Sequence, residues 1–303
     1  MNKALITKIV KDSILDGPGC RYVAFLKGCH LTCDWCHNPE TQSKKQEIML
    51  YPKFCIQCGK CLEKAPASHS SKEMPIHVDN KKLRQYRACL EACPTNALEY
   101  AAKEYTADEI ITDMMKHKTV YQTTGGGITL SGGEPLLKKD FALDVFQQAQ
   151  ALGIHTTVDT TATLPWKTIA QLIPVVDLWL IDIKHTTDKA VQAKRAITNL
   201  LKLSKEKDVH IWVRMPIVPN YNDSESIWHE IATIVQSAGD AVEFVDLLPF
   251  HPYGSAKYKA LNMTYLRKDT KPLNPEILEN AKAIFDQHLP SEKVRMGREM
   301  VNG

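Results

Sequence analysis

The sequence has neither a long hydrophobic run nor an excess of charge of one sign. Its longest apolar stretch, residues 175–183, is interrupted by Asp177 and Asp182, and a transmembrane helix needs about 20 predominantly apolar residues. The formal net charge is only +3 over 303 residues, which leaves no electrostatic footprint of a nucleic acid or a membrane surface. Lysines interrupt the first apolar residues, so the N-terminal segment lacks the core of a signal peptide. We therefore expect a globular, cytoplasmic protein.

No repeat or low-complexity segment stands out either. At about 100–200 residues per domain, the length predicts one large domain with a small second one. Nine cysteines are present, and without an export signal they indicate metal ligands before disulfides. Eight of them fall into two groups, residues 29–36 and 55–93, whereas Cys20 stands apart and is expected to have a packing role.

The first group has the spacing Cys29-x3-Cys33-x2-Cys36, in a loop just after an apolar run. A cubic iron–sulfur cluster is usually held by four thiolates, so three ligands leave one iron open to another molecule. An open coordination position is typical of a reactive metal site, whereas structural zinc sites are closed. Zinc stays open as the alternative, because His30 or His37 could supply a fourth ligand.

Cysteines return within residues 51–101, a segment with frequent prolines and no long helical period. Two-cluster bacterial ferredoxins repeat the pattern C-x2-C-x2-C-x3-C-P, and the last cysteine of each run ligates the other cluster. When this pattern is aligned with the chain, one of the two ligand sets is complete: Cys55, Cys58, Cys61 and Cys93. The other set keeps only Cys89, so we expect one auxiliary cluster, for electron relay or structural support. The alternatives are zinc binding or a vestigial segment.

From residue 107 onward, strand-like apolar segments alternate with helical ones. Such alternation predicts parallel βαβ units in a closed barrel, a partial barrel or a doubly wound sheet, all of which place their sites at the carboxyl ends of the strands. Including two segments before residue 30, the expected strands are 4–10, 22–26, 127–130, 154–159, 178–183, 210–216 and 242–248. The expected helices are 107–116, 138–151, 166–172, 191–204, 225–236 and 275–288.

A glycine-rich run precedes the second half of the chain and ends in Gly132-Gly133-Glu134-Pro135. Glycine lets a ligand approach the backbone closely, and the absence of a following Gly-Lys-Ser/Thr excludes a P-loop. Together with the cysteine loop, this run resembles the motif of the radical S-adenosylmethionine (SAM) enzymes that contacts the SAM amino group. Three further motifs, Asp16-Gly17-Pro18-Gly19, His37-Asn38-Pro39-Glu40 and Asp182-Ile183-Lys184, make the resemblance specific. The whole chain is similar to the glycyl radical enzyme activating enzymes, the pyruvate formate-lyase activase-like proteins.

The resemblance implies a fold and a set of cofactors. The fold would be α/β: a partial (β/α)6, TIM-like barrel formed by residues 1–50 and 102–303, with residues 51–101 inserted as a small ferredoxin-like α+β domain. A [4Fe-4S] cluster would be held by the three cysteines of the loop, and its open iron would bind SAM. The auxiliary [4Fe-4S] cluster would lie in the insert.

The resemblance also implies which residues form the SAM site. Gly133 and Glu134 would contact the SAM amino group, and Lys184 the SAM carboxylate. Asp159 and Asp182 would bind SAM or a monovalent cation. The full implied set is Trp35, Cys36, His37, Gly132, Gly133, Glu134, Asp159, Asp182, Ile183, Lys184 and His251.

The implied reaction is a reductive cleavage of SAM into methionine and a 5′-deoxyadenosyl radical, which takes a hydrogen atom from a backbone glycine of a partner enzyme. A flavodoxin- or ferredoxin-type protein would donate the electron, in an anaerobic cytoplasm. Three alternatives stay open: a radical SAM enzyme acting on a small molecule, an electron carrier that uses only the insert, and a zinc-bound interaction module.

Two places depart from the family pattern. Ala162 stands where the family usually has glycine, and residues 189–193 replace an expected Thr-Gly-x-Ser-Asn run. Both departures concern contacts with SAM and the partner on one side of the site. Neither concerns the cluster ligands.

Overall fold

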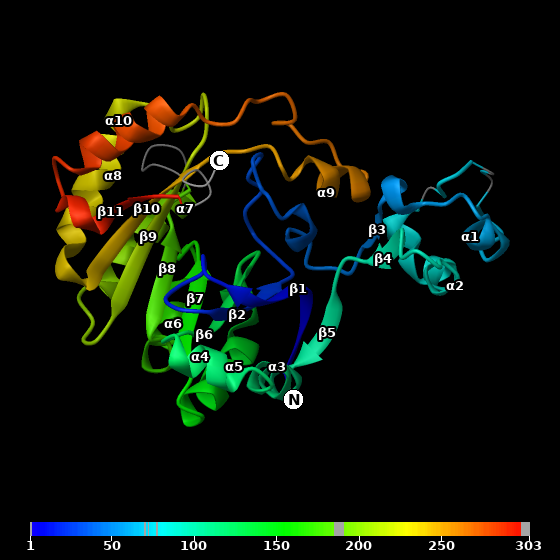
Figure 1. Ribbon diagram of the computed structural model, residues 1–303, viewed down its shortest axis with the longest axis horizontal. Helices are drawn as coiled ribbons and strands as arrows, with labels where there is room; N and C mark the ends of the chain where they lie inside the picture. Colours follow the sequence, from blue (N-terminus) through cyan, green and yellow to red (C-terminus); the bar gives the residue numbers. More distant parts are fainter. Residues whose placement is uncertain (1, 70, 72, 77, 185–190, 298–303) are drawn as a thin grey trace.

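The structure, a computed structural model, describes residues 2–69, 71, 73–76, 78–184 and 191–297. Its main body is a nine-stranded sheet with the order β11-β10-β9-β8-β7-β6-β2-β1-β5 (Figure 1). The strands from β11 to β2 in this order are parallel to their neighbours. At the other edge, β1 pairs antiparallel with both β2 and β5. The sheet is therefore mostly parallel, in agreement with the α/β prediction.

The bounds of the elements follow the predicted ranges closely. The strands of the main sheet are β1 (Lys3–Ser13), β2 (Arg21–Leu26), β5 (Lys103–Thr106), β6 (Gly127–Gly132), β7 (His155–Thr160), β8 (Leu178–Asp182), β9 (His210–Ile217), β10 (Val242–Pro249) and β11 (Val294–Met296). The helices around it are α3 (Ala107–Met115), α4 (Lys118–Thr123), α5 (Lys139–Ala151), α6 (Trp166–Ala170), α7 (Val191–Leu203), α8 (Glu225–Ala238), α9 (Ser255–Ala260) and α10 (Pro275–Phe285).

The strand order distinguishes between the architectures that the sequence left open. From β6 to β11, each strand lies beside the next one in the chain, whereas a doubly wound sheet reverses its order at a switch point. The run from β6 to β11 contains no such reversal, whereas at the other edge β5 lies beyond β1 and β6 lies beside β2. The elements of the main body that the sequence did not predict, β5, β11, α4 and α9, have at most six residues, too few to show a clear hydrophobic period. Within the described part of the chain, every helix falls short of the length and hydrophobicity that crossing a bilayer would take.

β9 shows how the sheet separates its core from its site. Ile211 and Val213 belong to the main hydrophobic core, which also contains the buried faces of α5, α8 and α10. Trp212, Arg214 and Pro216 line a pocket instead. Because successive side chains of a strand point to opposite faces, one strand contributes to both the core and the pocket.

The cysteine-rich segment forms a small unit outside the main sheet, at one end of the molecule (Figure 1). β3 (Ile48–Leu50) and β4 (Leu98–Tyr100) pair antiparallel, and α1 (Lys60–Glu63) and α2 (Arg87–Glu91) lie between them in the chain. The unit has its own core, formed by Ile48, Cys61, Ile76, Tyr86, Cys89 and Leu98. β3 precedes the expected boundary at residue 51, so the two-stranded sheet joins both sides of it. The division of the chain at residues 51 and 101 stays a prediction.

Candidate active site

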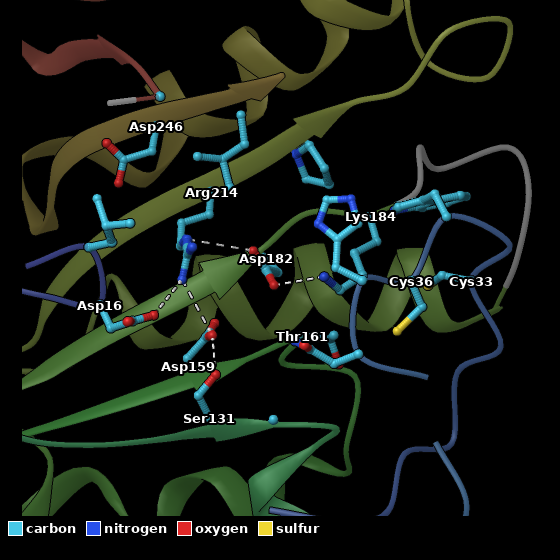
Figure 2. A pocket seen from close by; sticks show the side chains of 18 of the residues that line it. Asp16, Cys33, Cys36, Ser131, Asp159, Thr161, Asp182, Lys184, Arg214 and Asp246 are labelled. Atoms are coloured by element: carbon cyan, nitrogen blue, oxygen red, sulfur yellow. Dashed lines mark hydrogen bonds and ion pairs between the residues drawn. The ribbon is translucent and has the colours of Figure 1, made fainter. Parts of the chain in front are cut away.

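A pocket of about 430 Å³ lies at the carboxyl ends of the parallel strands. It brings the cysteine loop together with the ends of β6, β7, β8 and β10, which are far apart in the sequence (Figure 2). Most of the residues implied to bind SAM line this pocket: Trp35, Cys36, His37, Gly132, Gly133, Asp159, Asp182, Lys184 and His251. Cys29 and Cys33 line it too. Ile183 and Glu134 do not belong to the lining; Ile183 packs in the main core.

The cysteine loop is closed at its neck by backbone hydrogen bonds. Gly28 N–H donates to Thr41 O at 2.7 Å, and Cys29 N–H donates to Gln42 O at 2.9 Å. The buried Lys27 side chain donates to Glu40 O and to a Glu47 carboxylate oxygen, both at 2.6 Å. Because these bonds join the residues before the loop to those after it, they fix the three cysteines between them.

The three thiols of the loop are partly buried and face one pocket. Burial raises the pKa of each, that of Cys33 to about 11, while the Lys184 ammonium acts in the opposite direction. Among the described residues, no three Cys, His, Asp or Glu side chains converge closely enough to hold a single metal ion. The cysteines of an iron–sulfur cluster bind different irons and need not converge on one point. Three thiols of one loop face the same pocket, and this arrangement fits a cluster held by thiolates.

Asp159, at the end of β7, is held by two donors inside the pocket (Figure 2). Its Oδ2 accepts a hydrogen bond from Ser131 Oγ at 2.6 Å and lies 3.3 Å from Arg214 Nη1. Its Oδ1 is buried and has no hydrogen-bond partner among the described residues. Burial, together with the charge of Asp182, raises the pKa of Asp159 to about 6. A buried carboxylate oxygen without a partner can accept a ligand donor or a cation.

Asp182 and Lys184 form an ion pair at the end of β8, with 2.7 Å between Oδ2 and Nζ. Burial disfavours the ionised form of Asp182, but Lys184 and Arg214 outweigh it and lower the pKa of this carboxyl. Burial likewise disfavours the charged form of Lys184, and Asp182 outweighs it and raises the pKa of the ammonium. The pair stays charged at neutral pH and presents an ammonium group to the pocket.

Glu134 lies behind the pocket wall. Its Oε1 accepts hydrogen bonds from Thr160 Oγ1 at 2.8 Å and Leu136 N–H at 3.2 Å. Its Oε2 accepts from Thr161 N–H at 3.0 Å and Thr161 Oγ1 at 2.7 Å. The residue is 1% exposed, so its carboxylate makes these four hydrogen bonds inside the protein. The sequence indicates this inward role of Glu134. A proline often occupies the first position of a helix, so Glu134-Pro135 can begin one, and here Glu134 caps a short helix.

Gly133 is required by a close approach of two backbones. A Cβ at this position would collide with Gly28 O and would lie 2.8 Å from Thr41 O, both at the neck of the cysteine loop. The end of β6 is thus packed directly against the loop that carries the cysteines. The glycine pair therefore also sets where the loop sits, besides leaving room for a ligand.

His37 and His251 stack on one wall of the pocket, with 4.0 Å between the ring centroids. His37 Nε2–H donates to His251 O at 2.8 Å, which fixes the tautomer of His37. Burial and the neighbouring His251 lower the pKa of His37 to about 4. Trp35 packs beside them with Val218 and Phe250. This wall is aromatic, and aromatic faces suit the stacking of a planar group.

Several pocket residues were not singled out as site residues from the sequence. Arg214 Nη1 lies 3.8 Å from Asp16 Oδ1 and also contacts Asp159 and Asp182 (Figure 2). On the same face, Arg295 makes a two-point ion pair with Asp246, at 2.7 and 3.0 Å. The sequence feature that could have identified Arg214 as a site residue is its position as a charged residue within an otherwise apolar strand.

Ala162 adopts a left-handed backbone conformation with φ of 51° and is fully buried. An L-residue with a Cβ is strained there, whereas glycine is not, which accounts for the glycine of the family pattern. Asn199 Nδ2 donates to Ala162 O at 2.7 Å and helps to hold this turn. Residues 189 and 190 of the other departure lie outside the described residues, and 191–193 begin α7.

The insert brings part of its predicted ligand set together. Cys61 is close enough to Cys55 and Cys93 for their charges to raise its pKa further, after the effect of burial. Burial raises the pKa of Cys93 as well, but backbone amides of Leu98 and Thr95 outweigh it, so this pKa lies below its usual value. Cys58 is exposed, and Cys89 is fully buried in the small core. Cys55, Cys61 and Cys93 thus come near one another, and thiolates are the ligands that iron–sulfur clusters prefer.

Residues 23–229 match the family model of the radical SAM superfamily. The chain is 33% identical over 274 residues to the benzylsuccinate synthase activating enzyme of Thauera aromatica, covering 86% of this chain and 82% of that protein. It is 33% identical to the (2S)-3-sulfopropanediol dehydratase activating enzyme of Klebsiella oxytoca, over 88% of each. It is 34% identical to the isethionate sulfite-lyase activating enzyme of Nitratidesulfovibrio vulgaris, over 84% of this chain and 86% of that protein. The chain belongs to the radical SAM superfamily and, within it, to the glycyl radical enzyme activating enzymes.

Proposed function

We propose that this protein activates a glycyl radical enzyme, taking a hydrogen atom from a backbone glycine of that partner. One observation carries the proposal: three cysteines on one closed loop share a pocket with Gly133, Asp159 and Lys184, in a chain that belongs to this family of activating enzymes. When bound, a [4Fe-4S] cluster on Cys29, Cys33 and Cys36 would supply the electron that splits SAM reductively into methionine and a 5′-deoxyadenosyl radical.

The residues of the pocket hold and orient SAM. The Lys184 ammonium binds the SAM carboxylate, while Asp182 keeps that ammonium in place at 2.7 Å. The free Asp159 Oδ1 accepts a hydrogen bond from SAM or binds a monovalent cation. The aromatic wall of His37, His251 and Trp35 excludes water from one side of the pocket, which protects a reactive radical from side reactions.

Glu134 has a supporting role in this proposal, in place of the direct contact with the SAM amino group that the resemblance implied. Its carboxylate ties the end of β6 to Thr160 and Thr161, and both threonines line the pocket. It therefore positions the pocket wall between β6 and β7. The polar groups left for the SAM amino group are those of the wall itself.

The architecture and the insert belong to the same proposal. The open, sequential run of parallel strands supports a partial (β/α)6 barrel, and the segment from β3 to β4 supports a ferredoxin-like insert at residues 51–101. Cys55, Cys58, Cys61 and Cys93 would hold one auxiliary cluster there. The electron donor would be a flavodoxin- or ferredoxin-type protein, in an anaerobic cytoplasm.

The test is an anaerobic incubation of the iron-loaded protein with SAM, a chemical reductant and a glycyl radical enzyme encoded near it, followed by electron paramagnetic resonance. A glycyl doublet on the partner is expected, with one 5′-deoxyadenosine formed for each radical. SAM breakdown without any glycyl signal would favour the remaining alternative, a radical SAM enzyme with a small-molecule substrate. A protein that binds zinc and does not cleave SAM would refute both.

A further inference from the structure

The excess of positive over negative charge in this protein lies in the insert. Residues 51–101 contain eight lysines and arginines against five acidic residues, whereas the rest of the chain contains thirty of each. The formal net charge of +3 thus comes entirely from one sixth of the chain. A surface of one sign attracts partners of the other sign and speeds their encounter. The insert is therefore the part of the molecule that attracts an acidic partner.

The turn before α1 exposes apolar side chains and one cysteine of the predicted auxiliary ligand set. Phe54 is 48% and Ile56 is 64% exposed, and Cys58 is exposed while Cys61 is buried. Gln57, between Ile56 and Cys58, has a positive φ of 56°, so the backbone curls sharply here. Cys58 is thus the most exposed of the four predicted ligands, and it lies beside the exposed apolar side chains of Phe54 and Ile56.

Three exposed lysines surround this turn: Lys53, Lys60 and Lys64. Lys53 Nζ lies 4.7 Å from the centre of the Phe54 ring. None of the three forms an ion pair with another described residue. Lysines that are exposed and form no ion pair with a described residue are available to an incoming acidic protein, although Glu63 on the same helix is exposed beside them.

The turn is also accessible and distant from the SAM pocket. Figure 1 shows α1 at the outer end of the insert, on the side of the molecule away from β7–β11. A protein bound beside α1 leaves the carboxyl ends of those strands uncovered. The glycine of the partner enzyme can therefore approach the SAM pocket while a second protein occupies this turn.

We infer that the surface formed by Lys53, Phe54, Ile56, Cys58, Lys60 and Lys64, here called the lysine surface, docks a small acidic one-electron carrier protein. The inference rests on the proposed function, because only a reductive reaction needs such a donor. One electron would leave the reduced carrier, which is thereby oxidised, and would reduce the oxidised cluster that Cys55, Cys58, Cys61 and Cys93 would hold; no proton moves. A small apolar centre with a charged rim is typical of transient redox encounters, which bury less than about 1,200 Å².

The experiment compares two triple variants of the full-length, iron-loaded protein. The first is Lys53→Glu/Lys60→Glu/Lys64→Glu on the lysine surface. The control is Lys167→Glu/Lys194→Glu/Lys205→Glu, which changes the net charge equally at exposed lysines of the main body. The probes are a flavodoxin and a small ferredoxin of known negative charge. Their dissociation constants are measured anaerobically by calorimetry over a salt series, and enzyme reduction by each reduced probe is followed by stopped-flow absorbance.

We expect the first variant to bind at least one of the two probes tenfold or more weaker at low salt, with a flatter salt dependence and slower reduction by that probe. The control should behave like the wild type, and both variants should cleave SAM normally with dithionite. Unchanged binding of both probes by the first variant, or equal weakening in the control, overturns the inference. The inference is also overturned if the first variant loses binding to the glycyl radical enzyme but binds both probes normally. If the wild type fails to cleave SAM even with dithionite, the proposed function itself is wrong.

Discussion

Replacing Glu134 by glutamine separates a supporting role from direct contact with SAM. The two carboxylate oxygens each face one backbone donor, Leu136 N–H on Oε1 and Thr161 N–H on Oε2. A glutamine has only one acceptor oxygen, and its amide group carries two hydrogens on the other side. Whichever way the amide is turned, one backbone N–H therefore faces an NH2 group. Hydroxyl groups can rotate to adapt, but these two backbone donors cannot.

The magnitude follows from the burial of the site. Glu134 is 1% exposed, so water cannot replace the lost acceptor. A buried donor left without a partner costs about 1–3 kcal/mol, and each hydrogen bond to a charged group contributes about 1.5–3 kcal/mol. We expect Glu134→Gln to lower the free energy of unfolding by about 2–4 kcal/mol. For a domain of 150–250 residues, this corresponds to a fall in Tm of roughly 4–16 °C.

The assay is anaerobic differential scanning calorimetry without SAM, with Thr160→Val as the matched control. That control removes one hydroxyl donor from Oε1 and the acceptor of Ala162 N–H, but it leaves the carboxylate of Glu134 in place, so it should cost about 2–4 kcal/mol as well without removing a carboxylate contact with SAM. SAM affinity is measured separately by equilibrium dialysis. If Glu134→Gln melts like the wild type and yet loses SAM binding, the carboxylate contacts SAM directly and the supporting role is refuted.

Three more predictions concern the ligands and charges of the site. Cys36→Ala should abolish 5′-deoxyadenosine formation, whereas Cys58→Ala should retain part of it; equal and total loss in two folded variants would contradict an auxiliary role for the insert. Lys184→Met should weaken SAM binding in calorimetry and lower the free energy of unfolding by about 3 kcal/mol, because Asp182 then keeps only the longer contact with Arg214, at 4.0 Å. Asp159→Asn tests a pH dependence: because burial raises the pKa of Asp159 from 3.8 to about 6, the ionised carboxyl disfavours the folded state at neutral pH, and this penalty disappears on acidification through that range. Relative to the wild type, the variant should gain up to about 3 kcal/mol in urea unfolding between pH 4 and pH 7.5, and a pH-independent difference would show that Asp159 has an ordinary pKa.

The sequence predicted what depends on local spacing. The cysteine loop needs only Cys29, Cys33 and Cys36 within one turn of chain, and the alternation of strands and helices needs only local hydrophobic periods. The positions of Asp159 and Lys184 followed because they end neighbouring parallel strands, whose carboxyl ends meet at one edge. For these residues, the placement in the pocket was expected before the fold was known.

The direction in which a side chain points at a strand end was harder to predict. Glu134 follows Gly132, whose φ of 111° turns the chain, and its carboxylate points to Thr160 and Thr161 instead of into the pocket. The role of Arg214 depends on three carboxylates from other parts of the chain, Asp16, Asp159 and Asp182. Local sequence patterns do not predict such long-range pairs. Motif spacing therefore predicted most residues of the pocket, but not which residues form ion pairs with them.

The neck of the cysteine loop explains how these separate parts are kept in register. Gly133 leaves no space for a Cβ against Gly28 O and Thr41 O, so the end of β6 and the loop can move only together. The carboxylate of Glu134, the next residue, then fixes the end of β7 relative to the same point. The cysteines, the glycine pair and the strand ends that face SAM are thus linked through two consecutive residues. Since interactions within one network are not additive, a change at Gly133 or Glu134 should disturb the geometry of the cluster and of the SAM site together, whereas a change at Lys184 should leave the packing of β6 against the loop intact and act through the lost charge.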